Sequence, residues 1–334
     1  MTGKKKSGKS GADTAAHQRA LQRVQDAKDA RAGKAKGGKG GRKAAVQAGA
    51  TEEPARLPAQ HVAKPGRESE LELAPRFLAP GYEGSGKLRD RVALVTGADS
   101  GIGRAVAVLF AREGADVAIC YLDEHADARQ TRRHVEAEGR RALLLAGDVK
   151  DAAFCRKAVE KAVKTFGKLD ILVNNAAFQL HAESLEDITD ERLDETLRTN
   201  IGGYFRMARA ALPHLGRGAC IINTGSVTGL EGSSHLLDYA ATKGAIHAFT
   251  KSLASNLLPK GIRVNAVAPG PVWTPLNPAD SPARKVAEFG RHTDMHRAAQ
   301  PEELSPAYVF LASPVCSGYI TGIVLPVTGS VGAI

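Results

Sequence analysis

The chain has 334 residues, 43% of them hydrophobic and 25% charged, which is long enough for one large α/β domain or two small ones. No apolar run of about 18 residues suggests a membrane span or a secretory signal. The four cysteines lack a CxxC or metal-ligand spacing, so we expect buried thiols, a reducing cytoplasm and no metal.

A net charge of +10 would suit a nucleic-acid-binding protein, but all of it comes from residues 1–50, which hold nine lysines, four arginines and three aspartates. These residues are rich in Lys, Gly and Ala, and we expect them to be disordered, with a transient helix at most over 16–32. The tail is interpreted as a solubilising extension whose contact with polyanions is weak and non-specific. Residues 51–86 carry five prolines and predict an extended arm over the body.

Strands alternate with helices from residue 88 onward. The predicted strands are 92–96, 117–121, 142–146, 171–173, 221–224, 264–268 and a short one at 323–327. The predicted helices are 104–113, 126–138, 152–166, 190–215 and 236–258. Continuous apolar strands between amphipathic helices indicate a parallel sheet covered on both faces, so residues 87–334 are expected to form one doubly wound, Rossmann-type α/β domain of about seven strands.

A glycine-rich turn follows the first strand and precedes a helix, with the sequence Thr-Gly-Ala-Asp-Ser-Gly-Ile-Gly over 96–103. Glycines there let the backbone approach a pyrophosphate closely, and the helix amino terminus adds N–H groups and a positive dipole end. The candidate cofactor-binding residues of this turn are Gly97, Ser100, Gly101, Ile102 and Gly103.

Three further segments follow later strands in the order seen in classical short-chain dehydrogenases/reductases, which the turn also resembles. They are Asp148-Val149, Asn174-Asn175-Ala176, with Ala177 where the family has Gly, and the run Pro-Gly-Pro-Val-Trp-Thr over 269–274. The resemblance implies that Asp148 contacts the adenine ring, and that the Val272 backbone and the Thr274 hydroxyl hold the nicotinamide amide. The cofactor contacts it implies are Asp148, Val149, Asn175, Ala176, Pro269, Gly270, Val272 and Thr274.

The choice between NAD and NADP depends on charge near the second strand. An acidic residue about twenty positions past the glycines binds the ribose 2′-hydroxyl of NAD, whereas a basic one accepts the 2′-phosphate of NADP. Asp123 lies 20 residues past Gly103, although an acidic residue also suits an exposed turn. Tyr121 and Leu122 end the strand uncharged, and Arg104 could still meet a phosphate. We therefore expect NAD or NADP, with a slight lean to NAD, and Tyr121, Leu122 and Asp123 as candidate contacts.

Tyr239 and Lys243 are four residues apart on a predicted helix, so they share one face. A nearby ammonium lowers the pKa of a phenol toward the working pH, where proton transfer is most efficient. Ser226 lies 13 residues before Tyr239, and this Ser-Tyr-Lys spacing again resembles the short-chain family. The hypothesis is that Ser226 hydrogen-bonds the substrate carbonyl, while Tyr239 gives or removes the proton.

The resemblance implies further roles. Lys243 would also hold the nicotinamide ribose, Tyr239 would contact the cofactor, and Asn200 would support a proton relay through water. His181 and His235 flank the predicted cleft and are interpreted as ordinary loop or substrate-contact residues, since Tyr239 already fills the proton-transfer role. The arm and the segments around the turn are most similar to bacterial general-stress-type oxidoreductases with an amino-terminal extension.

The expected activity is interconversion of a small carbonyl compound and an alcohol by hydride transfer from or to the cofactor. Two alternatives stay open: a dinucleotide-binding sensor or scaffold without turnover, and a nucleic-acid-associated protein that binds through its tail. The resemblance implies a homotetramer packed through the helices around 190–215 and 236–258.

Overall fold

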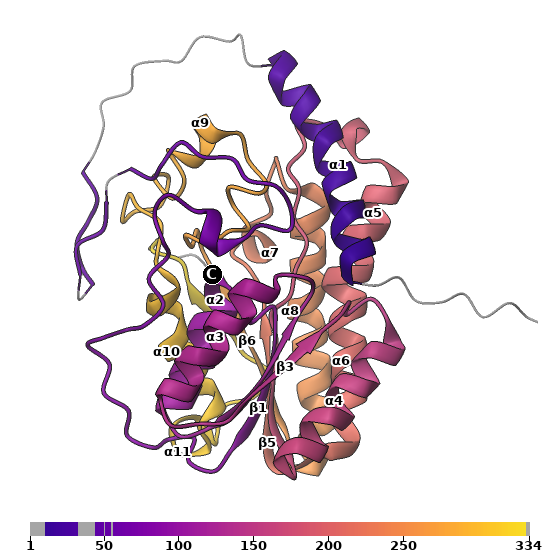
Figure 1. The fold of residues 1–334 in the computed structure, drawn as a ribbon, viewed down its shortest axis with the longest axis vertical. Coiled ribbons are helices and arrows are strands. Elements are labelled where there is room, and N and C mark those ends of the chain that lie inside the picture. Colours follow the sequence, from indigo (N-terminus) through magenta and orange to yellow (C-terminus); the bar gives the residue numbers. More distant parts are fainter. Residues whose placement is uncertain (1–10, 33–43, 50, 55, 332–334) are drawn as a thin grey trace, which may run out of the picture.

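Seven parallel strands form one sheet at the centre of the molecule (Figure 1). This computed structural model describes residues 11–32, 44–49, 51–54 and 56–331. The strands lie in the order β3-β2-β1-β4-β5-β6-β7, which confirms the predicted doubly wound fold. Their bounds are β1 Val92–Thr96, β2 Asp116–Tyr121, β3 Ala142–Ala146, β4 Leu169–Asn174, β5 Leu215–Thr224, β6 Arg263–Pro269 and β7 Val324–Val327. The order reverses between β1 and β4, and a doubly wound sheet binds its ligands at such a switch point.

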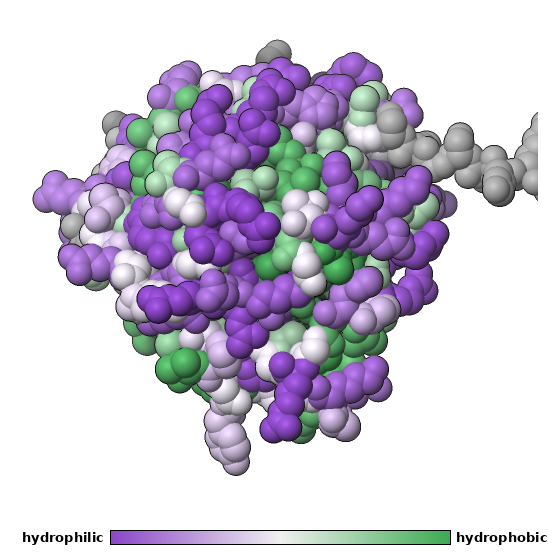
Figure 2. Space-filling view, turned by 60° about the horizontal axis from the view of Figure 1, so that its bottom comes forward, coloured by the Kyte–Doolittle hydropathy of each residue, from purple (hydrophilic) through white to green (hydrophobic). Residues whose placement is uncertain are grey.

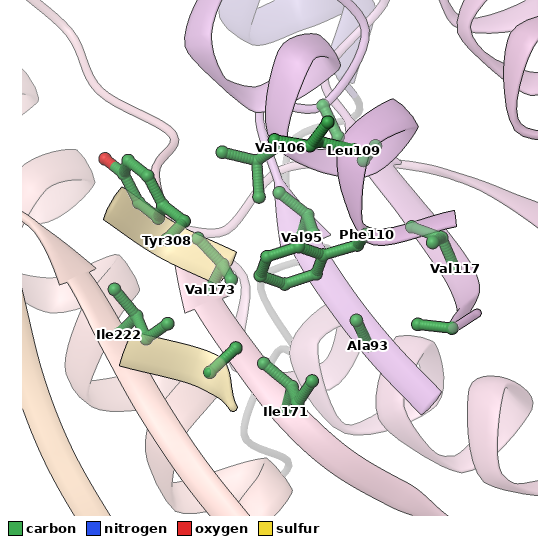
Figure 3. Close-up of a cluster of buried hydrophobic side chains, with 14 of the residues drawn as sticks. Ala93, Val95, Val106, Leu109, Phe110, Val117, Ile171, Val173, Ile222 and Tyr308 are labelled. Atoms are coloured by element: carbon green, nitrogen blue, oxygen red, sulfur yellow. The ribbon is translucent and has the colours of Figure 1, made fainter. Parts of the chain in front are cut away.

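Helices cover one face of the sheet with α2 (Gly101–Arg112), α3 (His125–Ala137) and α10 (Pro301–Ala312). Figure 3 shows Val106 and Phe110 of α2 and Tyr308 of α10 over Val95 and Val173 of the sheet. All five side chains are buried. Burying each apolar side chain of this size contributes about 1.5–3 kcal/mol, so this layer fixes α2, and with it the glycine turn, on the sheet.

The opposite face packs against α4 (Ala152–Phe166), α6 (Gly203–Ala211) and α8 (Leu237–Leu257). Val159, Met207 and Leu257 reach the sheet from these three helices. Because strand side chains alternate between faces, Leu94 belongs to this layer while its neighbour Val95 belongs to the other. The shorter helices are α7 (Thr228–Glu231), α9 (Ala283–Val286) and α11 (Pro314–Ser317).

Two helix predictions need correction. The stretch 190–215 is not one helix: it divides into α5 (Asp190–Leu197), a π-helical turn (Arg198–Gly202), α6 and a 3-10 turn (Leu212–His214) before β5 begins. Helix α10 was not predicted, because Pro306 inside it is typical of a helix break.

The amino-terminal segment is also not as predicted. Residues 11–32 form a regular helix, α1 (Gly11–Ala32), that packs on the body, so the expectation of disorder is wrong for them. Its buried face carries Thr14, Gln18, Gln22 and Gln25 at helical spacing. Residues 1–10 and 33–43 of the predicted tail lie outside the described residues.

Hydrogen bonds rather than apolar packing hold the middle of α1. The Gln22 amide nitrogen donates to the carbonyls of Val62 (2.9 Å) and Ala279 (3.0 Å), and its oxygen accepts from the Lys64 N–H (2.9 Å). Buried amides are stable when satisfied in this way. Figure 1 shows α1 alongside α5, and the Gln18 amide donates to Glu195 of α5 (3.0 Å).

The described part of 51–86 follows an extended path over the body, as predicted, with one 3-10 turn (Glu68–Glu70). Trp273 is fully buried and its indole N–H donates to the Leu73 carbonyl of this arm (2.8 Å). Arg76 pairs with Glu302 at the start of α10 (3.0 Å). The arm is therefore part of the packed structure rather than a free linker.

The face of the molecule shown in Figure 2 is mainly hydrophilic, with apolar side chains between the hydrophilic ones. No helix in the described part of the chain combines the length and apolarity needed to cross a bilayer. The cysteines are free thiols; Cys120, Cys155 and Cys220 are buried as expected, whereas Cys316 is exposed.

Candidate active site

A cavity of about 380 Å³ lies at the carboxyl ends of the strands, a size typical of a small-molecule site. The predicted site residues that line it are Gly97, Ser100, Gly101, Ile102, Tyr121, Leu122, Asp148, Val149, Asn175, Ala176, Ser226, Tyr239, Lys243, Pro269, Gly270, Val272 and Thr274. The predicted residues that do not line it are Gly103, Asp123 and Asn200. Segments far apart in sequence thus meet at one edge of the sheet.

The glycine turn has a shape that only glycine tolerates. Gly97 and Gly101 have φ angles of +63° and +50°, in the left-handed region. A Cβ atom on Gly103 would lie 1.9 Å from the Gly97 carbonyl oxygen, so this glycine lets α2 pack against the turn. The Gly101 N–H donates to the carboxylate of Glu68 from the arm (2.6 Å). The arm therefore binds one of the N–H groups that the sequence assigned to the cofactor.

Asn175 ties the turn to the end of β4. Its amide nitrogen donates to the carbonyls of Thr96 and Gly97, both at 3.1 Å, and its N–H donates to the Thr96 hydroxyl (2.8 Å). The Thr224 hydroxyl at the end of β5 donates to the Asn175 amide oxygen (3.1 Å). Asn175 therefore positions the cavity floor.

Carboxylates surround the end of the cavity near β2 and β3. Besides Asp148, Asp99 and Glu124 line it, although sequence analysis did not select them. Burial and the neighbouring Asp99 raise the pKa of Glu124 to about 8, and burial likewise raises the pKa of Asp99. Asp123 instead lies outside the cavity, near His125 (3.7 Å). The acidic side chain that lines the cavity after β2 is therefore that of Glu124 and not that of Asp123.

Arg104 is not free to meet a phosphate. Its side chain is 1% exposed and donates to the Glu68 carboxylate (2.6 Å) and to the carbonyls of Asp99 and Asp127. The suggestion that Arg104 binds a 2′-phosphate is therefore not supported, because the arm already occupies its guanidinium group.

Ser226, Tyr239 and Lys243 meet at the other half of the cavity. The Lys243 ammonium lies 5.2 Å from the centre of the Tyr239 ring and donates to the Thr224 carbonyl (2.8 Å). Ser226 hydrogen-bonds Tyr239, and its hydroxyl accepts from Thr228 (3.0 Å). Helix α8 carries the tyrosine and the lysine, and the serine lies two residues past the end of β5.

The electrostatics differ from expectation. Burial raises the pKa of Tyr239, and the hydrogen bond from Ser226 offsets this only in part. Burial lowers the pKa of Lys243 to about 7, so its positive charge is only partly present at neutral pH. The predicted lowering of the Tyr239 pKa by Lys243 is therefore not found in the protein alone.

Asn200 lies in the π-helical turn and is buried behind the residues that line the cavity. Its amide oxygen accepts from the Phe178 N–H (2.7 Å), and its nitrogen donates to the Phe178 carbonyl (2.9 Å) and Thr242 (3.1 Å). Single-turn π bulges occur frequently at functional sites. The turn fixes the loop after β4 to helix α8 beside Tyr239.

His247 lies behind the site and contacts the backbone of Ser226, and sequence reasoning did not select it. It lies one turn past Lys243 on α8, and its ring Nε2 accepts from the Ser226 N–H (3.4 Å). Burial and the neighbouring Lys243 lower its pKa to about 4, so the imidazole is neutral and can accept. Sequence analysis could have selected His247 because its spacing from Tyr239 and Lys243 places all three on one face of a helix.

The residues present fit a dinucleotide. Gly97, Ser100, Gly101 and Ile102 of the glycine turn line the cavity, with Asp148 at one end of it and Tyr239 at the other. At the Tyr239 end, the amide of Asn277 orders the loop by donating to the Val272 carbonyl (2.6 Å) and the Thr274 hydroxyl (3.3 Å). A phenol, a hydroxyl and a lysine together can transfer a proton to or from a substrate oxygen.

Comparison with known proteins identifies the family of the chain. A family described as "Enoyl-(Acyl carrier protein) reductase" matches residues 97–331. The chain is 54% identical over 266 residues to the uncharacterized oxidoreductase YhdF of Bacillus subtilis, covering 80% of this chain and 92% of that one. It is 52% identical over 277 residues to general stress protein 39 of the same organism, covering 83% and 96%.

Solved structures of short-chain dehydrogenases are also similar to this chain. A short-chain dehydrogenase from Burkholderia cenocepacia in complex with NADP is 36% identical, with a TM-score of 0.69, and covers 73% of this chain and 98% of that one. A short-chain dehydrogenase from Mycobacterium paratuberculosis bound to NAD is 31% identical, with a TM-score of 0.66, and covers 73% and 98%. The chain therefore belongs to the short-chain dehydrogenase/reductase family and is an NAD(P)-dependent oxidoreductase that interconverts carbonyl compounds and alcohols.

Proposed function

We propose that Tyr239 exchanges the proton with the substrate oxygen. In reduction its hydroxyl gives the proton to the carbonyl oxygen, and in oxidation the phenolate takes the proton of the alcohol. Ser226 donates a hydrogen bond to the same oxygen and stabilises the negative charge that develops there. The nicotinamide, when bound, supplies or accepts the hydride. The meeting of Ser226, Tyr239 and Lys243 at one end of the cavity supports this assignment.

Once the dinucleotide is bound, Lys243 has two proposed tasks: its ammonium favours the phenolate of Tyr239 and binds the nicotinamide ribose hydroxyls. The 5.2 Å separation between its nitrogen and the Tyr239 ring supports the first task. Asn200 is assigned the support of a water-borne proton relay, which its place in the π-helical turn beside α8 favours.

The substrate proposed is a small carbonyl compound or secondary alcohol. Leu236 and Phe289 line the cavity, which supports an apolar group next to the reacting oxygen. The test is a nicotinamide absorbance screen over ketones, aldehydes, sugars and steroid-like alcohols with NAD and NADP, run in parallel with Tyr239→Phe. Turnover that depends on Tyr239 with at least one substrate is the expected result. Turnover that persists unchanged in Tyr239→Phe would contradict the assignment.

We propose NAD rather than NADP as the preferred dinucleotide. Three carboxylates line the half that receives the adenosine, from Asp99, Glu124 and Asp148, and the Arg104 guanidinium is held by Glu68. A 2′-phosphate would bring negative charge against Asp148, and also against Glu124 as the pH rises through its pKa of about 8, whereas a ribose hydroxyl can donate to these carboxyl groups. A ratio of kcat/KM above one for NAD over NADP is expected. A strong preference for NADP would overturn the proposal.

We propose a homotetramer that packs through α5, α6 and α8. Phe205 of α6 is half exposed and stacks on Phe249 of α8, with ring centres 3.9 Å apart. Leu193 and Leu197 of α5 are also exposed. Exposed apolar side chains of this kind are typical of subunit contacts. Light scattering at micromolar concentration should give four times the chain mass, and a monomer would contradict the proposal.

We further propose that residues 87–334 form the catalytic domain, with 51–86 as its arm, in a cytoplasmic enzyme. The free thiols support a reducing compartment. Residues 1–50 are proposed to contact polyanions weakly through their positive charge. Part of this positive charge also has a structural use, which the pairing of Lys28 with Asp187 (2.7 Å) supports. Cell fractionation and DNA titration at rising salt would test both points.

A further inference from the structure

Helix α1 reaches the cavity that is proposed to hold the dinucleotide. Thr14 and Gln18 line the cavity, as do Pro65 and Gly66 of the arm. The Thr14 hydroxyl donates to the carboxylate of Asp148, a residue of the same lining. The helix begins before residue 97, where the matched family region starts, so these contacts lie outside the family motifs.

A charged network behind the lining joins α1 to the end of β3 and to α5. The Gln18 amide donates to Glu195 (3.0 Å), and the Lys150 ammonium lies 2.5 Å from Glu195 and 3.7 Å from Asp148. Both carboxylates are nearly fully buried. Buried charges paired in this way hold a defined geometry, so the first turns of α1 have a fixed place beside Asp148.

The rest of α1 is anchored away from the cavity. Asp29 pairs with His181 (2.9 Å) and Lys28 with Asp187 (2.7 Å), while the Gln22 amide is satisfied by the arm and the loop at Ala279. These contacts fix the helix along its length. Helix α1 is therefore a positioned element and not a loose extension over the opening.

We propose that α1 is an added wall of the dinucleotide site, in which Thr14 and Gln18 enclose the adenosine half and slow release of the bound dinucleotide. The inference rests on the proposed placement of the adenosine at Asp148. A docked α1 then raises dinucleotide affinity, and a bound dinucleotide holds α1 in place to the same extent, because coupling between two binding events is reciprocal.

Helix α1 borders the cavity and does not fill it. The cavity keeps about 380 Å³ with Thr14 and Gln18 on its boundary. The Gly101 N–H is bound by Glu68 and not by α1. The Asp148 carboxylate accepts from Thr14 and from the Lys150 N–H (2.8 Å), which leaves acceptor capacity for an adenine amine, since a carboxylate offers about four lone-pair sites.

The first test compares the full chain with a chain that lacks residues 1–32. NADH and NADPH are titrated with each protein by fluorescence, and dissociation is followed by stopped flow. For the dinucleotide that the full chain binds more tightly, truncation should raise Kd roughly tenfold and speed dissociation, as loss of a few enclosing contacts would. An equal or lower Kd after truncation would overturn the inference.

Point variants separate the wall from the fold. Thr14→Val removes the hydroxyl at constant volume and Gln18→Leu removes the amide, and each should raise Kd about threefold to tenfold. Arg23→Ala, on the exposed side of α1, is the matched control and should bind as the full chain does. A Kd in both cavity-lining variants equal to that of the control would contradict the proposal.

Limited proteolysis gives a readout independent of activity. Saturating NADH or NADPH should slow tryptic cleavage at Arg19 and Arg23 of the full chain, whereas faster cleavage would mean that α1 competes with the dinucleotide. If the full chain bound neither dinucleotide, the proposed function would fail together with this inference. If the full chain bound one normally and truncation changed nothing, the wall alone would be wrong.

Discussion

Glu124 and Asp99 lie together at the adenosine half, and burial raises the pKa of Glu124 to about 8. Glu124 therefore gains its negative charge as the pH rises through about 8. A 2′-phosphate nearby is repelled more by the charged form than by the neutral one. The charge of this one side chain thus connects pH to the choice between the two dinucleotides.

The kcat/KM ratio of NADP to NAD should fall as the pH rises from 7 to 9. In Glu124→Gln this fall should disappear and the ratio at pH 9 should rise about tenfold, which corresponds to ~1.4 kcal/mol. Asp123→Asn, whose side chain lies outside the cavity, is the matched control. A parallel fall in wild type and Glu124→Gln would contradict this role.

Sequence reasoning came within one residue of this site. The twenty-residue spacing selected Asp123, but the turn after β2 directs Glu124 into the cavity and leaves Asp123 near His125. Spacing along a chain locates the end of a strand, whereas the direction of each side chain in the following turn depends on packing. For the same reason the spacing placed Tyr239 and Lys243 correctly, because both lie on one regular helix.

At the scale of elements, His181 clamps α1 to the body. Its ring bonds to Asp29 of α1 (2.9 Å) and to Asp280 (3.2 Å), with Lys64 and Arg192 as the positive neighbours. Burial opposes protonation, but the hydrogen bonds and charges of the two aspartates outweigh it and raise the His181 pKa. A raised pKa stabilises the docked state below the unfolded value of about 6.5, and this contribution is lost as pH rises through the folded value.

Docking of α1 should therefore weaken as the pH is raised from 6 to 9. The tryptic cleavage rate at Arg19 and Arg23 is measured at each pH for the wild type and for His181→Gln, and the wild-type rate is divided by the variant rate. Because glutamine cannot carry the charge, this division corrects for the pH dependence of the protease itself. The ratio should be smallest at pH 6 and should approach one at pH 9. A ratio independent of pH would show that the charge on His181 does not hold α1.

Helix α1 also shows what hydropathy cannot reveal. Its buried face carries Thr14, Gln18, Gln22 and Gln25 beside Ala15, so no apolar period marks it, and its stability depends on carbonyls and carboxylates supplied by distant segments. The strands, by contrast, are continuous apolar runs whose burial is visible in composition. The division of 190–215 into two helices could not be predicted for a related reason, since the helical period of the sequence continues on both sides of the π-helical turn.

At the scale of the whole molecule, the arm is bound to the domain by a buried ion pair. Glu68 forms a buried ion pair with Arg104, and their side chains are 5% and 1% exposed. Removing one partner of such a pair leaves a buried charge uncompensated, at a cost of about 3–5 kcal/mol. The arm thus contributes to the stability of the domain that carries the glycine turn.

Glu68→Ala should lower the melting temperature by roughly 10 °C, given the usual scaling for a domain of this size. Glu70→Ala, in the same 3-10 turn, is the matched control, because its pairing with Arg67 is exposed (59% and 44%) and contributes under about 1 kcal/mol. Calorimetry of both variants measures the difference. Equal small shifts would mean that the arm is not integral to the fold.

The central claim is that the Tyr239 phenol transfers the proton, and the kcat of Tyr239→Phe measures it most directly. With a substrate identified in the screen, kcat should fall about 10²-fold to 10⁴-fold, the range that general acid–base catalysis contributes. The dinucleotide Kd, measured by fluorescence on the same protein, should stay within about twofold, since phenylalanine keeps the ring and the packing. A near-normal kcat alongside that unchanged Kd would contradict the account.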